Sequence, residues 1–193
     1  MIKDVNVKSD KEKIKKLPQQ VFYSSREETN CPLITDMLKI SRKINEKESL
    51  KDKKDVIISF TYGKRMLING LVGDYPNIKR TELLEIVDYD PIKNNLLVMG
   101  STEPLIETSI HFMIHHARKE IKVVAQINKE DILKIIKNEI PILEKKFPIN
   151  SFEFIKQILK ELKDNKIIGI KNDVVLFVGK DVKEIEEMID KTL

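Results

Sequence analysis

All three histidines of the chain stand in one short segment, at His111, His115 and His116. On an α-helix, Glu107, His111 and His115 recur every four residues and therefore lie on one face, which Arg118 extends three residues later. A carboxylate beside two imidazoles suits a metal ion such as zinc, or acid–base catalysis with Glu107 as general base. The same spacing is also typical of a hydrogen-bonded subunit interface or a solvated helix face. The spacing alone leaves all of these interpretations open.

The helix that carries these side chains has its own signals. Residues 101–104, Ser-Thr-Glu-Pro, are of the types that begin helices. Apolar residues at helical spacing then predict one buried face, formed by Ile106, Ile110, Met113, Ile114 and Ala117. The helix is expected to end near residues 118–120, and the run 121–127 predicts a strand directly after it.

Hairpins and helices alternate along the rest of the chain. The expected elements are a helix from Pro32 to the charged residues 47–54, hairpins over 56–68 and 84–99, a short helix from Asp131, an edge strand over 140–143, a helix capped by Ser151, a hairpin over 166–178 and a last helix capped by Asp181. This order predicts an α/β fold with a mostly antiparallel sheet covered by helices, rather than a doubly wound parallel sheet.

Residues 1–31 carry runs of lysine and glutamate, followed by a polar cluster over residues 24–30. Too few apolar positions occur there to anchor a compact element. The sequence therefore predicts a loosely packed N-terminal extension over residues 1–31 and one globular domain over residues 32–193.

Composition excludes several classes of protein. Of 193 residues, 41% are hydrophobic and 34% charged, and no apolar run approaches the roughly 20 residues that cross a bilayer. The net charge is +4 and only five of the 35 basic residues are Arg, which argues against nucleic acid as a partner. No secretory signal follows Met1, so a cytoplasmic location is expected. The lone Cys31 is expected to act as a small apolar residue rather than as a nucleophile.

Several segments, in the same order over residues 33–190, resemble the class II aldolase/adducin family. The matching residues are Met66 to Asn69, Gly73 to Tyr75, Glu82 to Asp88, Pro104 to His111 and Asn172 to Ile185. The resemblance implies a three-layer α/β/α sandwich that usually assembles as a homotetramer. Enzymes of this family hold zinc or another divalent ion through three histidines and cleave or epimerise sugar phosphates. Glu107 falls on the glutamate that moves the proton in that reaction.

The other functional positions of the family carry different residue types here. Its His-x-His pair falls on Gln126 and Asn128, and its later histidine falls on Asn172 or Asp173. Its phosphate-binding positions fall on the run Val56 to Ser59 and on Leu105 and Ile106. Amides are weak zinc ligands, and apolar side chains hold no phosphate. No metal or other cofactor is therefore expected.

Two hypotheses of function follow. In the first, the chain has lost the zinc-dependent aldolase activity and is a non-catalytic binding or assembly module that self-associates and keeps a small-molecule pocket near Glu107. In the second, it is a divergent aldolase or lyase that uses Glu107 with other metal ligands, such as His111, His115 or Asp173. The loss of the metal and phosphate positions together favours the first.

Overall fold

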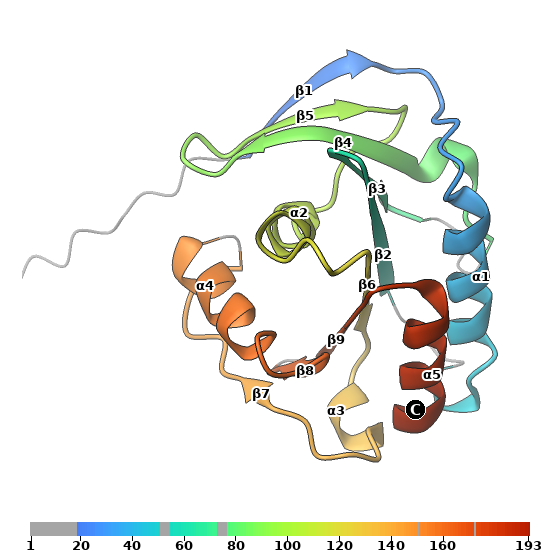
Figure 1. Cartoon of the computed structure of the whole chain (residues 1–193), viewed down its shortest axis with the longest axis vertical. Helices are drawn as coiled ribbons and strands as arrows, with labels where there is room; N and C mark the ends of the chain where they lie inside the picture. Colours follow the sequence, from blue (N-terminus) through green and yellow to red (C-terminus); the bar gives the residue numbers. More distant parts are fainter. Residues whose placement is uncertain (1–18, 51–54, 73–76, 150, 172) are drawn as a thin grey trace, which may run out of the picture.

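The computed structural model describes residues 19–50, 55–72, 77–149, 151–171 and 173–193 (Figure 1). Within them lie the strands β1 Gln20–Ser25, β2 Asp55–Tyr62, β3 Arg65–Asn69, β4 Leu83–Asp90, β5 Asn95–Met99, β6 Val123–Asn128, β7 Ile142–Leu143, β8 Ile167–Ile170 and β9 Val174–Gly179. The helices are α1 Ile34–Asn45, α2 Thr108–Ala117, α3 Ile132–Ile135, α4 Phe152–Glu161 and α5 Val182–Thr192, with short 3-10 turns at Glu48–Leu50 and Arg80–Glu82.

From α1 onward, the helices and strands follow the order that the sequence predicts. Two predicted helix caps are confirmed. The Ser151 side chain accepts a hydrogen bond from the Phe154 backbone N–H at the start of α4, and Asp181 accepts one from Glu184 N–H at the start of α5. Such caps satisfy backbone donors that have no partner within a helix.

The strand β1 is absent from the sequence prediction. It falls within the expected extension, yet it pairs with β5 in parallel, with Gln20 opposite Asn95. Its side chains alternate between exposed and half-buried, which is a weak signal because the strand lies at the edge of the sheet. Residues 20–25 therefore belong to the sheet, whereas residues 1–18 of the expected extension lie outside the described residues.

The described strands form one nine-stranded sheet in the order β1-β5-β4-β3-β2-β6-β9-β8-β7. The pair at each edge, β1 with β5 and β7 with β8, is parallel, and the pairs between them are antiparallel. The sheet is therefore mixed, and the expected antiparallel arrangement is only partly confirmed. The parallel pairs arise because β1 and β7 each reach their neighbour through a long connection rather than a hairpin.

Helices cover both faces of the sheet. The helices α1 and α5 lie side by side on one face, and α2 and α4 lie on the other (Figure 1). On the first face, buried side chains of α1 and α5 pack with sheet residues such as Ile58 and Phe177. On the second, α2 and α4 pack against Val124 and Leu176. The α/β fold that the sequence predicts is confirmed.

None of the described helices combines the length and apolar character needed to cross a membrane. The cytoplasmic location stays a prediction.

Candidate functional site

Glu107 lies at a cavity of about 140 Å³ where three strand ends meet the loop that leads into α2. The strand β2 pairs with β3 on one side and β6 on the other, so its first residue, Asp55, lies opposite Asn128 of β6. Asn69 at the end of β3 lines the same space. The fold thus brings residues from four distant segments around one carboxylate.

The surroundings of the Glu107 side chain favour its protonated form. It occupies the N-cap position of α2 without making a capping hydrogen bond through its side chain. Burial raises its pKa above the ordinary value, and the Asp55 carboxylate raises it further, while Lys145 acts in the opposite direction. A carboxyl group of this kind holds a proton more readily than an exposed glutamate, which is what a general acid or base needs.

The floor of the cavity is fixed by the backbone. Asn69 Oδ1 accepts a hydrogen bond from Ile58 N–H at 2.7 Å, and its Nδ2 donates to the Val56 carbonyl at 3.0 Å and to the Gly70 carbonyl at 3.1 Å. A Cβ atom at Gly70 would come within 2.6 Å of the Glu103 carbonyl oxygen, so glycine is required there. Asn69 is therefore a structural residue whose amide is already satisfied.

The predicted face of Glu107, His111, His115 and Arg118 does not form one site. The His111 and His115 rings lie in the interior, where both contact the Ser59 hydroxyl of β2, at 2.8 and 2.9 Å. Arg118 instead donates to the Leu162 carbonyl at 2.7 Å and pairs with Glu120.

Because both rings are buried within the chain, the structure contradicts two interpretations of this spacing, a subunit interface and a solvated face. The signal that sequence reasoning missed is Ser59, a polar residue inside an apolar strand. A buried hydroxyl needs a partner, and the helix facing that strand carries two imidazoles.

Two amides connect the histidines to the cavity. His111 Nε2 lies 3.3 Å from Gln126 Oε1, and Gln126 Nε2 lies 2.9 Å from Asn128 Oδ1. Asn128 lines the cavity. Gln126 is buried behind it and does not line it.

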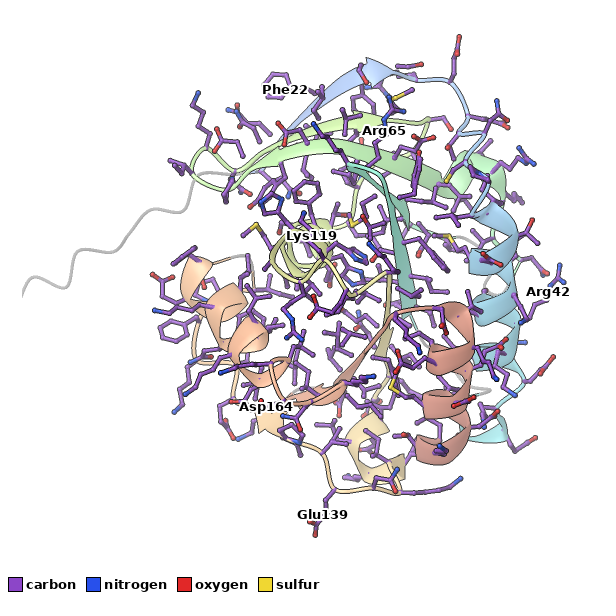
Figure 2. All side chains as sticks on the ribbon, viewed as in Figure 1. Phe22, Arg42, Arg65, Lys119, Glu139 and Asp164 are labelled. Carbon is purple, nitrogen blue, oxygen red and sulfur yellow. The ribbon has the colours of Figure 1, made fainter. Side chains whose placement is uncertain are left out.

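A second buried carboxylate, Glu85 of β4, lies at the other end of β3. It accepts hydrogen bonds from Thr29 and Tyr62, and Arg65 Nη1 donates to it at 3.1 Å. Arg65 lies near the end of the sheet that carries β1 and β5 (Figure 2). Burial raises the pKa of Glu85, but these three hydrogen bonds outweigh it, and the net pKa is lowered.

Cys31 lies beside this cluster, is buried and packs in the core, as the sequence predicts. Burial raises the pKa of its thiol, so the thiolate that a nucleophile requires is disfavoured. The Glu85 cluster itself is absent from the sequence prediction, because each partner lies 20 residues or more from Glu85 in the chain.

No family model and no curated protein matches the sequence. Solved structures do match. An L-fuculose 1-phosphate aldolase aligns with a TM-score of 0.65 at 12% identity, over 85% of this chain and 82% of that chain. A sugar-phosphate aldolase from Thermotoga maritima aligns with a TM-score of 0.56 at 14% identity, over 81% of this chain and 89% of that chain. The N-terminal class II aldolase domain of a Thermoplasma acidophilum protein aligns with a TM-score of 0.53 at 14% identity, over 86% of this chain and 94% of that chain.

This chain has the class II aldolase fold. The match is one of architecture, because sequence identity this low carries no information about substrate.

The zinc site that the class II aldolase fold implies does not fit the residues present. The sequence resemblance assigns two metal-binding histidines to the positions of Gln126 and Asn128, and the amides of these two residues are hydrogen-bonded to each other. Asp173 does not line the cavity, and Asn172 lies outside the described residues. In the part of the chain that the structure describes, no group of three or more His, Cys, Asp or Glu side chains is arranged to hold a metal ion.

Most of the positions that the sequence resemblance assigns to phosphate binding carry apolar side chains around this cavity. Val56, Ile57 and Leu105 line it, and Ser59 is occupied by the two histidines. No lysine or arginine is among the described residues that line it. Among the described lining residues, a phosphate group would therefore find no cationic side chain to bind it.

Proposed function

We propose that this chain is a non-catalytic member of the class II aldolase fold that binds a small polar molecule in the Glu107 cavity without zinc. The observation that carries the proposal is the donor set of the cavity. Amides stand at the metal positions and apolar side chains at the phosphate positions. The cleavage of sugar phosphates needs both groups, one to stabilise the developing oxyanion and one to hold the substrate.

The cavity itself supports binding. Its volume of about 140 Å³ admits a small molecule, and its walls combine apolar side chains with the carboxylates of Asp55 and Glu107 and the amide of Asn128. Apolar walls with a few converging polar groups are typical of ligand sites.

Self-association is a second part of the proposal. Leu71 and Ile106 lie beside the cavity with relative exposures of 73% and 52%. Exposed apolar side chains of this size are often covered by another protein surface. We expect sedimentation to detect an oligomer at micromolar concentration, and a monomer at that concentration would remove this part.

A divergent aldolase or lyase is the alternative function, and the raised pKa of Glu107 favours it. The first experiment is elemental analysis of the untagged protein, followed by a cleavage assay on L-fuculose 1-phosphate with added Zn²⁺. The proposal expects metal well below one ion per chain and no cleavage. A near-stoichiometric divalent ion, with cleavage that Glu107→Gln abolishes, would establish the alternative.

A matched control separates a specific effect from a general one. Glu139 is exposed on the connection between α3 and β7 and does not line the cavity (Figure 2). Glu139→Gln makes the same chemical change as Glu107→Gln and should leave any cleavage intact.

A further inference from the structure

Two buried imidazoles share one hydroxyl. His115 Nε2 lies 2.9 Å and His111 Nδ1 lies 2.8 Å from Ser59 Oγ. On its other side, His115 Nδ1 lies 3.1 Å from the Ile121 carbonyl oxygen. Ser59 and His111 are fully buried and His115 is 4% exposed, so water does not complete these hydrogen bonds.

The hydrogen-bonded chain continues through Gln126 to Asn128 at the cavity. An amide presents an oxygen acceptor at one end and a nitrogen donor at the other, and a half-turn of the amide exchanges them in the same space. The protonation of the histidines therefore determines which end of each amide faces its neighbour.

Counting the available protons decides which end of the Gln126 amide, oxygen or nitrogen, faces His111. The Ile121 carbonyl only accepts, so His115 carries its proton on Nδ1 and, when neutral, turns a lone pair toward Ser59. If Gln126 keeps Oε1 toward His111, that ring must donate from Nε2 and also turns a lone pair toward Ser59. One hydroxyl proton would then face two lone pairs, and one contact would be repulsive.

An additional proton on one ring would remove this conflict, but burial opposes it. Burial, together with the nearby His115, lowers the pKa of His111 to about 3, against the hydrogen bond to Gln126. Burial likewise lowers the pKa of His115 to about 4, against the hydrogen bond to Ile121, and the charges of Lys122 and Lys119 also lower it. Both rings are therefore neutral near pH 7.

With both rings neutral, every hydrogen bond is satisfied in one direction. Ser59 donates to His115, His111 donates from Nδ1 to Ser59, and Gln126 Nε2 donates to His111. Asn128 Nδ2 then donates to Gln126, which leaves Asn128 Oδ1 for the cavity. Both amides are turned by half a turn from the arrangement in which Gln126 Nε2 faces Asn128 Oδ1.

From this chain of hydrogen bonds we infer that Asn128 presents a carbonyl oxygen to the cavity and that the cavity is selective for a small protonated amine. The inference rests on the proposed function, that the cavity binds a small polar molecule. Asp55 and Glu107 add two carboxylates, and the donors of Asn69 are already used. Among the described lining residues, the side-chain groups left for a ligand accept hydrogen bonds, and an ammonium group offers three donors and no acceptor. A bound cation would also favour the ionised form of Glu107.

Three probes of nearly equal size test the selectivity on the full chain. Ethanolamine is a cation at pH 7, ethylene glycol is neutral and glycolate is an anion. We expect amide shifts in ¹⁵N NMR titrations to give a Kd for ethanolamine at least tenfold below the other two. Equal or tighter binding of ethylene glycol or glycolate overturns the inference and leaves the proposed function standing. Binding of none of the three overturns the proposed function together with the inference.

The donor and acceptor directions of these hydrogen bonds can be measured without a ligand. Long-range ¹H–¹⁵N correlation spectra of the histidine rings distinguish which nitrogen carries the proton. We expect Nδ1–H on both His111 and His115, and a proton on His111 Nε2 overturns the inference whatever binds.

Two variants then test whether these hydrogen bonds determine the preference for ethanolamine. Asn128→Ala removes the proposed acceptor at a partly exposed strand end and should raise the Kd for ethanolamine about tenfold, which corresponds to one hydrogen bond. Asn138→Ala, an exposed asparagine beyond α3, is the control and should leave the Kd unchanged. Ser59→Ala should reduce the preference for ethanolamine over glycolate, because Gln126 is then free to turn. An unchanged Kd in Asn128→Ala contradicts the inference.

Discussion

Glu85 and Glu107 are both withdrawn from solvent, yet the structure treats them in opposite ways. Glu85 accepts hydrogen bonds from Thr29, Tyr62 and Arg65, and its pKa is lowered in spite of burial. Glu107 makes no capping hydrogen bond with its side chain, lies near another carboxylate, and its pKa is raised. The difference teaches that burial alone does not decide the role of a carboxylate. The donors around it do.

The largest contrast is expected in stability. Glu85→Gln would leave at least one of its three donors without an acceptor, so the free energy of unfolding should fall by about 2 to 3 kcal/mol. Glu107→Gln should change it by less than about 0.5 kcal/mol, because that side chain is partly exposed and makes no capping hydrogen bond. Urea denaturation at pH 7 measures both. Equal losses in the two variants would contradict the comparison.

A single donor to Glu85 should carry part of that energy. Tyr62→Phe removes the hydroxyl that donates to Glu85 and keeps the ring, so we expect a loss of about 1 kcal/mol. Tyr23→Phe removes a hydroxyl that donates to the Thr102 carbonyl at 3.0 Å and is the matched control outside the cluster. In the Glu85→Gln background, the effect of Tyr62→Phe should shrink, whereas the effect of Tyr23→Phe should not. Additive effects of the Tyr62 and Glu85 changes would argue against a shared network.

The two carboxylates should also respond to pH with opposite signs. The pKa of Glu85 is lowered from 4.5 by folding, so its stabilisation is present above that value and is lost as the pH falls. The pKa of Glu107 is raised from 4.5, so wild type and Glu107→Gln should match in acid, and wild type should become the less stable as the pH rises through the raised pKa. The change at Glu107 should reach about 0.5 kcal/mol or less, because its side chain is partly exposed. Unfolding free energies of wild type, Glu85→Gln and Glu107→Gln from pH 2 to 8 test this. A difference between wild type and variant that has the same sign at pH 7 for both residues would refute it.

The smallest expected effect sharpens the account of Glu107. Asp55→Asn removes a charge that raises the pKa of Glu107, so that pKa should fall while the cavity keeps its shape. Carbon-13 NMR titration of the Glu107 carboxyl group measures the change. Asp164→Asn, an exposed substitution before β8, is the control (Figure 2). No change in Asp55→Asn would mean that burial acts alone.

Local patterns predicted much of the fold. The caps Ser151 and Asp181 and the hairpin turn at Gly63, where φ is +58°, each depend on neighbours within a few residues, so the sequence carries their signals directly. The strand β1 was missed because its partner lies about 75 residues away and its own pattern is weak.

The candidate site divides in the same way. Glu107 and Asn128 were identified through the resemblance to a family, and the structure places both at one cavity. Their partners were not identified, because no local rule connects Ser59 to His111 or Thr29 to Glu85. Pairings between distant segments are properties of the folded chain, and a periodic pattern along one helix does not specify what faces it.

The parallel pairing of β1 with β5 has a consequence for how the sheet opens. The strands β2 to β5 pair in their chain order, whereas β1 pairs with a strand about 75 residues away and buries little of its own surface. Segments with few buried contacts and distant partners open at lower free energy than the rest of a domain. The backbone amides of β1 should therefore exchange with solvent deuterium well before those of β2 and β6, whose ends line the cavity.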